Sequence, residues 1–409
     1  MKITYLVHQF FPEYFTGTEK FILKMSSMMQ KAGHSVRVIT YSFQEESLFD
    51  KSVSDIIYRE YAYKGVPVIA MRHKETHKYL HLILGNTGMA SMVEYFTSIE
   101  KPDIVHVGHP MRINEFITAY KSMGVPYIIT LTDFWLICPR VNLVNLRDDL
   151  CAGPEGAKTC KNLCPDLPYH LVVERLGIAR GILEGAQKVI SPSKFLADIF
   201  KKELENIDIT VINHGMSNGE IKQNNRKYEK GDKLIFCYAG TLDLHKGIHI
   251  LIDAFKKVKT HNAILKIYGS GYNPEFVNKL YDMAKNDKRI EFCNVFPEGN
   301  FGDVFSNVDV VIVPSKWYEN YPLILHEALV CNVPVIASNV GGMAEKIKDG
   351  VNGFTFQIGD AHNLRKVIEK VAADAEILND LKKNIKSFLI PTVEQEAHAY
   401  NRIYTSIKQ

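Results

Sequence analysis

Residues 308–338 read VDVVIVPSKWYENYPLILHEALVCNVPVIAS, and this stretch decides the fold because strand, loop, helix and strand follow one another in it. The apolar, β-branched run Val308–Val313 has the length of a buried parallel strand. Pro322 fits the first turn of a helix, where its missing N–H costs nothing. The stretch therefore predicts one unit of a parallel α/β sheet.

Two glutamates, Glu319 and Glu327, lie eight positions apart in this stretch. We expect Glu319 in the loop and Glu327 in the second turn of the helix, at the strand end where open α/β sheets bind ligands. A helix N-terminus holds phosphate, and carboxylates suit hydroxyls, so a nucleotide sugar fits. The ordinary alternative is a surface pair that stabilises the helix dipole. The loop also carries three aromatic residues, Trp317, Tyr318 and Tyr321, which favours a ligand-binding site over a surface pair.

Length and composition describe an ordinary globular protein. A chain of 409 residues is about right for two domains, and 46% apolar with 23% charged residues is typical of soluble proteins. The formal charge of +3 is too small to argue for nucleic acid, although it permits contact with an acidic membrane surface. No run is long enough for a transmembrane helix, and MKITYLVHQFF lacks the layout of a signal peptide. We expect a cytoplasmic protein, with peripheral contact at the inner face of the membrane allowed.

Buried strands and amphipathic helices alternate on both sides of one polar stretch. In the first half we expect strands at Ile3–Val7, Val36–Thr40, Val66–Met71, Ile104–Val107, Tyr127–Thr130 and Lys188–Ile190. In the second half we expect them at Leu234–Ala239, Ile264–Tyr268, Ile290–Phe292, Val308–Val313 and Val333–Ala337. The alternation predicts an α/β protein with two Rossmann-like, doubly wound domains facing a cleft.

The same pattern gives the expected domain boundaries. The first domain covers residues 1–215 and includes a cysteine-rich insert at about 138–168. The polar stretch 216–232 has no core pattern and is the expected linker. The second domain covers 233–390. An amphipathic helix in 391–409 closes the chain, and we expect it to pack back on the first domain.

Three glycine turns follow strands or precede helices in the second half. Gly240–Gly247 (GTLDLHKG) carries Lys246, a compact charge suited to a diphosphate. Tyr268–Gly271 (YGSG) and Gly341-Gly342 allow close approach by a ligand, although plain tight turns explain them equally well. The chain has no GxGxxG, no GxxxxGK[ST] and no Asp-x-Asp, which argues against a dinucleotide oxidoreductase, a P-loop and a metal-held diphosphate.

These elements together resemble the retaining, two-domain GT-B glycosyltransferases of family 4, also called glycosyltransferase group 1. Glu319 and Glu327 match the family's Glu-x7-Glu, and the resemblance is dense from Leu234 to Ile358. The other matching runs are AGTLDLHKGIHILIDAF, YGSG, VVIVPS and VPVIASNVGGMAEKIKDGVNGF. The resemblance implies a retaining, hexosyltransferase-like enzyme that moves a sugar from a nucleoside-diphosphate sugar to an acceptor hydroxyl. The product would belong to a polysaccharide, a glycolipid or another glycoconjugate.

The resemblance also implies a donor site in the second domain. Glu327 would hold the ribose and Glu319 the donor sugar, while Lys246 and the amides of Asn320–Leu323 would hold the diphosphate. The remaining implied donor contacts are Gly17, Thr18, Gly240, Thr241, Gly269, Gly271, Val295, Tyr321 and Pro322. The family often has arginine where Thr241 stands, so the charge balance rests more heavily on Lys246. No catalytic metal is expected, because the helix N-terminus and Lys246 would stabilise the departing diphosphate.

The first half supplies the remaining catalytic candidates. Gly17 in FTGTE matches a family glycine, although without the family Thr16 or Thr18 would be a helix cap. His109 follows a strand and is a candidate contact for a sugar hydroxyl or phosphate, with a structural histidine as the equal alternative. Many relatives have histidine where Thr132 stands. The role of that histidine is left unfilled in this chain or falls to Asp133 or His109. These two residues join Glu319 and Lys246 as catalytic candidates.

Four of the seven cysteines lie within 27 positions, at Cys138, Cys151, Cys160 and Cys164. Such a cluster in a cytoplasmic enzyme suggests a structural zinc site, and the final C-x3-C spacing is compatible. A loop of this length also needs a staple. The DFWLICPR segment with its following cysteines is similar to one in a subset of the family. Free thiols or a redox-sensitive loop are the alternatives.

Two other functions use the same scaffold. A nucleotide-sugar epimerase would need no acceptor. A non-catalytic nucleotide-sugar-binding subunit is kept open by Thr132 and Thr241. A lipid-linked acceptor is plausible because the stretch His73–Leu84 (HKETHKYLHLIL) could rest on a membrane surface, although such a stretch is more often an amphipathic packing helix.

Overall fold

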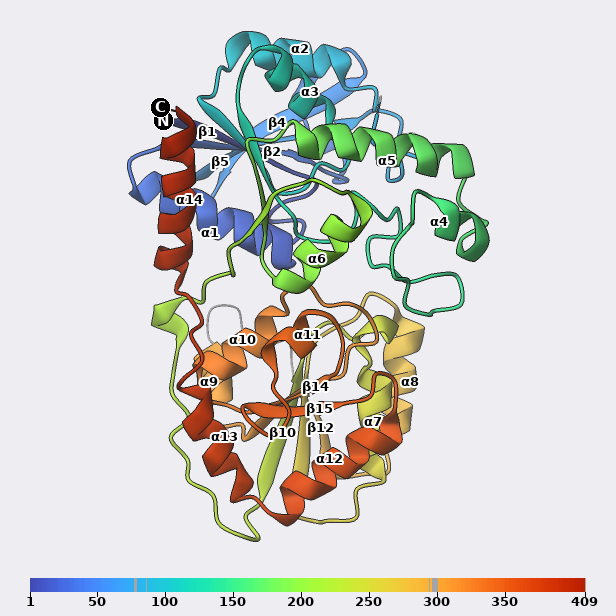
Figure 1. Cartoon of the computed structure of the whole chain (residues 1–409), viewed down its shortest axis with the longest axis vertical. Coiled ribbons are helices and arrows are strands. Elements are labelled where there is room, and N and C mark those ends of the chain that lie inside the picture. Colours follow the sequence, from blue (N-terminus) through green and yellow to red (C-terminus); the bar gives the residue numbers. More distant parts are fainter. Residues whose placement is uncertain (77–78, 86, 294, 296–300, 409) are drawn as a thin grey trace. The chain divides into compact units, whose positions relative to one another are not determined.

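The computed structural model describes residues 1–408 apart from 77–78, 86, 294 and 296–300. The chain forms two compact units (Figure 1). Unit 1 consists of Met1–His214 and Val393–Gln409, and unit 2 of Gly215–Thr392. The boundary therefore lies between residues 214 and 215, and the end of the chain belongs to unit 1 together with its beginning.

The sheet of unit 1 has the order β3-β4-β5-β2-β1-β6-β7-β8-β9. Its strands are β1 (Lys2–Val7), β2 (Ser35–Tyr41), β3 (Lys51–Val53), β4 (Ile56–Tyr63), β5 (Val66–His73), β6 (Ile104–Val107), β7 (Tyr127–Thr130), β8 (Lys188–Ser191) and β9 (Ile209–Val211). The helices are α1 (Gly17–Lys31), α2 (Ala90–Ile99), α3 (Glu115–Ser122), α4 (Lys158–Leu163), α5 (Tyr169–Glu184), α6 (Lys194–Glu203) and α14 (Val393–Lys408). In this order, all neighbouring strands from β5 through β2 and β1 to β9 pair in parallel, whereas β3 and β4 add an antiparallel edge next to β5.

This antiparallel edge was not expected from the sequence. β4 and β5 form a hairpin whose two-residue turn, Lys64-Gly65, has φ angles of 48° and 80°. Positive φ at both residues is the geometry that fits the twist of two paired strands. Lys-Gly is a weaker sequence signal than Asn-Gly or Asp-Gly, and β4 mixes charged residues among its aromatic ones. The hairpin is therefore hard to detect without knowing that β5 is its partner.

The sheet of unit 2 is wholly parallel and has the order β12-β11-β10-β13-β14-β15. Its strands are β10 (Leu234–Ala239), β11 (Ala263–Tyr268), β12 (Ile290–Cys293), β13 (Val310–Val313), β14 (Val335–Ser338) and β15 (Gly353–Phe356). Its helices are α7 (Ile248–Lys256), α8 (Pro274–Ala284), α9 (Phe301–Phe305), α10 (Leu323–Val330), α11 (Gly341–Lys346), α12 (Ala361–Ala373) and α13 (Ile377–Ile385). The chain adds strands first on one side of β10 and then on the other, so the strand order reverses between β10 and β13. Ligands bind at such a reversal in open α/β sheets.

The polar segment 216–232, expected as a linker, lies within unit 2 and is tied to its sheet. Tyr228 is buried, and its hydroxyl donates a hydrogen bond of 2.9 Å to the carboxylate of Asp309. Arg226 pairs with the same carboxylate at 3.1 Å, and the Asn224 side chain donates to the carbonyl of Val308 at 2.7 Å. Composition alone cannot separate a solvated linker from a segment whose polar groups pair with buried ones.

Helix α14 is joined to the sheet of unit 1 by a chain of buried hydrogen bonds. The Tyr404 hydroxyl lies 2.6 Å from Nδ1 of His106 on β6, and Nε2 of the same ring lies 2.8 Å from the Thr130 hydroxyl on β7. Thr130 also contacts the Tyr400 hydroxyl at 2.8 Å. Burial lowers the pKa of His106 to about 3, so the imidazole is neutral and donates from one ring nitrogen only.

The described part of His73–Leu84 does not form an amphipathic helix. Residues 79–82 form turns, while 77–78 lie outside the described residues. Leu80, Leu82 and Leu84 are buried, at every second position. Among the described residues, no helix has both the length and the apolar character needed to span a bilayer.

We expect Tyr404→Phe to destabilise the protein by about 1–3 kcal/mol, because it leaves Nδ1 of the buried His106 without its hydrogen-bond partner. Urea denaturation at pH 7 measures this loss. Tyr281→Phe is the matched control, since Tyr281 is 48% exposed on α8. Equal stability of the two variants would contradict the role given to the network.

We expect stability to fall as the pH drops below about 6.5. The unfolded chain protonates His106 near its ordinary pKa of 6.5, whereas the folded chain does so only near pH 3, so acid favours the unfolded state. Between pH 6.5 and 5 this histidine should cost about 2 kcal/mol. His106→Gln should lose correspondingly less stability over that range in urea denaturation. An unchanged pH dependence in that variant would show that His106 does not titrate in this way.

Candidate active site

Glu319 lies in the loop between β13 and α10, where one carboxylate oxygen accepts three hydrogen bonds. Its Oε1 accepts from Lys246 Nζ at 2.7 Å, from the Ser315 hydroxyl at 2.8 Å and from the Trp317 indole at 2.8 Å. The residue is only 9% exposed. All three of these hydrogen bonds go to Oε1, so we expect a ligand to bind at Oε2.

The surroundings of Glu319 keep its carboxylate ionised. Burial by itself would raise its pKa. The charge and hydrogen bond of Lys246 oppose this, with the hydrogen bonds from Trp317 and Ser315, and the pKa of Glu319 ends below its ordinary value. An ionised carboxylate in a fixed orientation is a strong acceptor for ligand hydroxyls.

The loops after β10 and β13 touch each other at the strand-order reversal. Lys246 ends a 3₁₀ turn at Leu244–Lys246, and its Nζ lies 4.9 Å from the centre of the Trp317 ring. The His245 and Trp317 rings are 4.4 Å apart between centroids. The backbone N–H of Lys316 donates to the carbonyl of His245 at 2.8 Å. The ion pair is thus held by a backbone bond and an aromatic contact between the same two loops.

Close backbone packing explains several of the glycines. A Cβ at Gly247 would come within 1.8 Å of the Pro314 carbonyl oxygen, and one at Gly342 within 2.2 Å of the Asn320 carbonyl oxygen. The Gly342 N–H also donates to the backbone carbonyl of Glu319 at 2.6 Å. Ligand approach was the reason considered from sequence for Gly341-Gly342, but contact with the Glu319 loop already requires a residue without a side chain at 342.

Helix α10 begins at Leu323 with Pro322 at its N-cap, one residue later than expected. Glu327 is half-buried in the second turn. The Tyr321 ring stacks on the His326 ring at 3.6 Å between centroids, and His326 donates from Nδ1 to the Pro322 carbonyl at 2.9 Å. His326 was not recognised from sequence, and its buried position next to Glu327 holds the loop against the helix.

The other expected donor contacts fall in two groups. Gly240, Thr241, Gly269 and Gly271 lie at the ends of the paired strands β10 and β11, where a Cβ at Gly269 would come within 1.9 Å of the Gly240 carbonyl oxygen. Val295 is 62% exposed, between residues outside the described set. Gly17 and Thr18 begin α1 in unit 1, and Thr16 rather than Thr18 is the N-cap, in a capping box with Glu19.

The catalytic candidates of unit 1, His109 and Asp133, contact each other. His109 Nε2 lies 3.0 Å from Asp133 Oδ2, and the Met111 N–H donates to His109 Nδ1 at 3.3 Å. These bonds place the histidine proton on Nε2, which therefore donates to the carboxylate. His109 is 2% exposed, whereas the Asp133 side chain is 23% exposed. The carboxylate is thus the accessible end of the pair.

His8 joins this pair and was not recognised from sequence. Its ring packs on that of His109 with 3.9 Å between centroids. Burial holds the pKa of His8 well below its ordinary value, and the positive charge of Arg112 acts in the same direction. His8, His109 and Asp133 follow β1, β6 and β7, three neighbouring strands, and this shared edge is the signal that could have found His8. The Thr132 hydroxyl donates to the Gly108 carbonyl at 3.1 Å.

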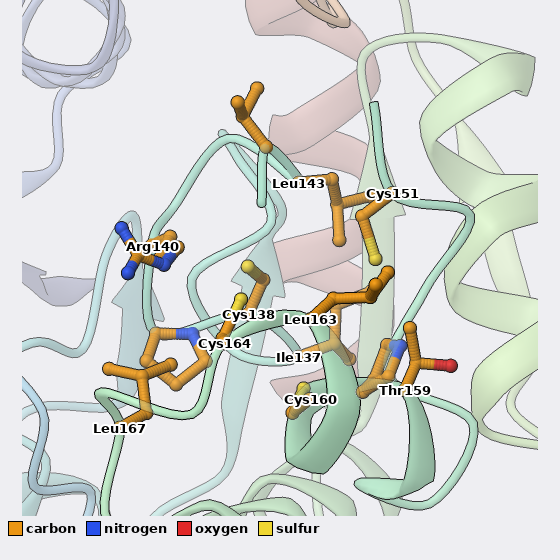
Figure 2. A pocket seen from close by; sticks show the side chains of 13 residues that line it. Ile137, Cys138, Arg140, Leu143, Cys151, Thr159, Cys160, Leu163, Cys164 and Leu167 are labelled. Atoms are coloured by element: carbon orange, nitrogen blue, oxygen red, sulfur yellow. The ribbon is translucent and has the colours of Figure 1, made fainter. Parts of the chain in front are cut away.

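The four cysteines of the insert meet at one small cavity (Figure 2). All seven cysteines of the chain are free thiols. As the side chains stand, no three His, Cys, Asp or Glu residues in the described part of the chain are grouped closely enough to hold a metal ion. The predicted zinc site is therefore not shown.

Both halves of the chain match known glycosyltransferase families. Residues 15–217 match the family described as Glycosyltransferase Family 4, and residues 220–388 match Glycosyl transferases group 1. Together the two matches span most of the chain. The first half of the chain thus belongs to Glycosyltransferase Family 4 and the second half to Glycosyl transferases group 1. The family predicted from sequence is confirmed, while the retaining subtype and the relation of the DFWLICPR segment to a subset stay predictions.

Solved structures similar to this glycosyltransferase-type chain share its whole fold. One is the sucrose-phosphate synthase of Thermosynechococcus elongatus, with a TM-score of 0.70, 17% identity and coverage of 99% of this chain and 98% of that one. Another is Anabaena HepE in complex with UDP and glucose, with a TM-score of 0.70, 17% identity and coverage of 99% and 100%. The GT-B fold with two Rossmann-like units, as predicted, is thereby confirmed.

Curated relatives of this glycosyltransferase-type chain match over shorter stretches. The putative glycosyltransferase YtcC of Bacillus subtilis is 27% identical over 196 residues, which are 44% of this chain and 47% of the relative. A lipopolysaccharide 1,2-N-acetylglucosaminetransferase of Salmonella typhimurium is 28% identical over 214 residues, which are 48% and 52%. The chain spans about half the length of these relatives.

We expect Lys246→Met to cost about 1–3 kcal/mol, because it leaves a carboxylate that is 9% exposed without its cation. The pair is partly exposed, so solvent screening keeps the loss below that of a fully buried pair. The double variant Lys246→Met/Glu319→Gln should recover part of the loss. Urea denaturation at pH 7 completes the double-mutant cycle, and simple additivity would contradict the coupling.

Lys316→Met is the control, since this lysine lies in the same loop and forms no ion pair within the described residues.

The pKa of Glu319 is lowered in the folded protein, so its ionised form stabilises the fold above its unfolded pKa of about 4.5. That stability is lost as the pH falls through the folded pKa. The difference between wild type and Lys246→Met should therefore shrink below about pH 4.5.

Proposed function

We propose that the protein is a glycosyltransferase that moves a sugar from a nucleoside-diphosphate sugar to an acceptor hydroxyl. One observation carries the proposal. An ionised, oriented Glu319 and the cation of Lys246 lie together at the strand-order reversal of unit 2, beside the N-terminus of α10. That combination of a hydrogen-bond-accepting carboxylate, a cation and a helix dipole suits a ligand with hydroxyls and a diphosphate.

The hydrogen bonds of the ion pair leave room for such a ligand. An ammonium group has three N–H donors, and Glu319 takes one of those on Lys246. The others can hold the diphosphate while the pair stays intact. Glu319 Oε2 can accept from a donor-sugar hydroxyl, and Glu327, one helical turn into α10, from the ribose. In this proposal the N–H groups at the start of α10 stabilise the departing diphosphate together with Lys246.

The environment of Glu319 suits binding better than attack on the sugar. Three hydrogen bonds to one oxygen and a lowered pKa make a carboxylate a weak nucleophile. We therefore propose retention by attack of the acceptor from the face that the leaving group departs from. The bond from the anomeric carbon to the phosphate oxygen breaks, the bond to the acceptor oxygen forms, and the acceptor proton leaves with the nucleoside diphosphate.

In unit 1 we assign the His109–Asp133 pair to the acceptor. Asp133 is the exposed end of the pair, and its Oδ1 is already held by the Trp135 N–H at 2.8 Å. A carboxylate fixed by a neutral histidine and a backbone N–H can accept a hydrogen bond from a sugar hydroxyl. Polysaccharide and lipopolysaccharide synthesis is suggested by relatives such as the lipopolysaccharide 1,2-N-acetylglucosaminetransferase reported above and a capsular polysaccharide biosynthesis glycosyltransferase of Staphylococcus aureus, 27% identical over 43% of this chain. A lipid-linked acceptor at a membrane surface is part of this proposal.

The two other functions considered from sequence have no support among the relatives reported above. An epimerase would convert the donor without any second sugar-bearing product. A non-catalytic subunit would bind nucleotide without turnover. Analysis of the products formed from radiolabelled donor separates these cases from a transferase.

We expect one of UDP, GDP, ADP or dTDP to raise the melting temperature. A ligand at about a hundred times its Kd adds roughly 2.7 kcal/mol. Glu327→Gln should weaken that binding at least about tenfold, if the carboxylate holds two ribose hydroxyls at about 1 kcal/mol each. Lys316→Met should bind as the wild type does. No shift with any of the four nucleotides, or a shift with NAD alone, would contradict the donor site.

Transfer activity tests the chemistry separately. We expect Lys246→Met and Glu319→Gln each to reduce turnover about 100-fold or more, because each removes a charge from the donor site. Asp133→Asn should lower kcat/KM for the acceptor while leaving nucleotide binding unchanged. The assay needs the donor nucleotide from the melting experiment and a set of acceptor glycans. Wild-type activity in all three variants would refute the assigned residues.

A further inference from the structure

The insert that carries four cysteines is a long loop with little regular structure to hold it. It runs from β7 to α5, and α4 is its single helix in the described structure. Four residues of the insert with side chains larger than that of alanine adopt left-handed backbone angles: Val141 (φ 70°), Leu143 (φ 53°), Asp148 (φ 59°) and Glu155 (φ 49°). Such conformations cost about 1–3 kcal/mol each and persist only where the surroundings fix them. Something other than secondary structure must hold this loop.

The four cysteines are lining residues of one cavity in the loop. Cys138, Cys151, Cys160 and Cys164 line one cavity of about 10 Å³, which is close to the space of a single water molecule (Figure 2). Cys160 lies close enough to each of the other three for their charges to interact. The cavity wall is otherwise apolar apart from Arg140 and Thr159. A pocket of this size and lining suits one small ion bound by sulfur.

Two cations, Arg140 and Arg175, stand beside the sulfurs, and the charge of Asp133 acts on Arg175 without a direct ion pair. Arg175 is 2% exposed, donates to the carbonyls of Leu82 and Leu136, and forms no ion pair with a carboxylate in the part of the chain that the structure describes. Its Nη2 is buried without a hydrogen-bond partner among those residues. Cys138 and Cys160 are among the groups of opposite charge that act on it. A buried guanidinium in this position is stabilised if the neighbouring sulfurs are negative.

Hydrogen-bond donors also surround the sulfurs themselves. Burial raises the pKa of Cys138 and of Cys151, and the backbone N–H groups of Arg140 and Leu143 at Cys138 and of Gly153 at Cys151 oppose that rise. In both cases one donor lies two residues after the cysteine. The Arg140 guanidinium pairs with Asp166 at 2.5 Å and also bonds to the Cys164 sulfur. N–H groups aimed at sulfur stabilise a thiolate over a thiol.

We propose that Cys138, Cys151, Cys160 and Cys164 bind one Zn²⁺ as a tetrathiolate that staples the insert. The four thiols lose four protons to solvent as Zn²⁺ binds, and the resulting centre carries a net charge of −2 next to Arg140 and Arg175. Thiolates favour Zn²⁺ over harder cations, and structural zinc sites are closed and four-coordinate. Because the thiols are not yet grouped for coordination, binding turns all four sulfurs inward to about 2.3 Å from the ion. The proposal does not depend on transferase activity.

The metal content of the full chain tests the proposal. We expect the protein purified under reducing conditions without added metal to contain about one zinc ion per chain by mass spectrometry. It should release that ion when the thiols are titrated with p-mercuribenzoate. Cys160→Ser should lose the metal, whereas Cys293→Ser, at a half-buried cysteine outside the cavity, should keep it. If Cys160→Ser does not fold, the wild-type measurements still decide.

Two further wild-type measurements sharpen the result. Replacement of zinc by Co²⁺ should give the charge-transfer absorption of a tetrahedral cobalt thiolate, and chelation should expose residues 138–168 to limited proteolysis. The proposal fails if the wild-type chain contains no zinc and retains none after incubation with one equivalent and gel filtration. It also fails if the unfolded, unreduced chain has fewer than seven titratable thiols, because a disulfide would then be the staple.

Discussion

The ion pair between Lys246 and Glu319 joins the two loops that meet where the strand order of unit 2 reverses. β10 and β13 are neighbours, but their following helices turn away from each other, so no chain connection fills the space between their loops. The pair fills it, supported by the Trp317 ring and by the backbone bond from Lys316 to His245. The close approach of Gly247 and Gly342 to these loops allows that geometry. The carboxylate is thereby ionised and oriented before any ligand arrives, which lowers the cost of ordering it on binding.

Unit 1 applies the same principle at a different sheet edge. His8, His109 and Asp133 follow three neighbouring parallel strands, so their side chains meet although they are far apart in the sequence. Thr132 makes a local hydrogen bond to Gly108, and the imidazole next to Asp133 comes from His109, which follows β6. Below this edge, His106 joins β6, β7 and α14 through buried hydrogen bonds. Helix α14 is thus part of the framework that supports His109 and Asp133, the pair assigned to the acceptor.

The places where sequence interpretation failed share a cause. The segment 216–232 looks solvated, yet Asn224, Arg226 and Tyr228 pair with groups of the unit 2 sheet. His73–Leu84 looks amphipathic, yet residues 79–82 form turns, and Leu80, Leu82 and Leu84 are buried at every second position. β4 was missed because its stability depends on pairing with β5. In each case the local pattern is ambiguous, and a partner distant in sequence selects the structure.

The sequence by itself determined the alternation of strands and helices, the two-unit GT-B architecture, and the position of Glu319 before a helix that carries Glu327. Those features follow from hydrophobic periodicity, helix and turn propensities, and motif order, which are local properties of the chain. Only the tertiary structure decided that Lys246 pairs with Glu319, that the His8 ring packs on that of His109, and that four cysteines line one cavity. These contacts depend on which strands become neighbours. Strand order is fixed by packing among distant segments, so no local pattern specifies it.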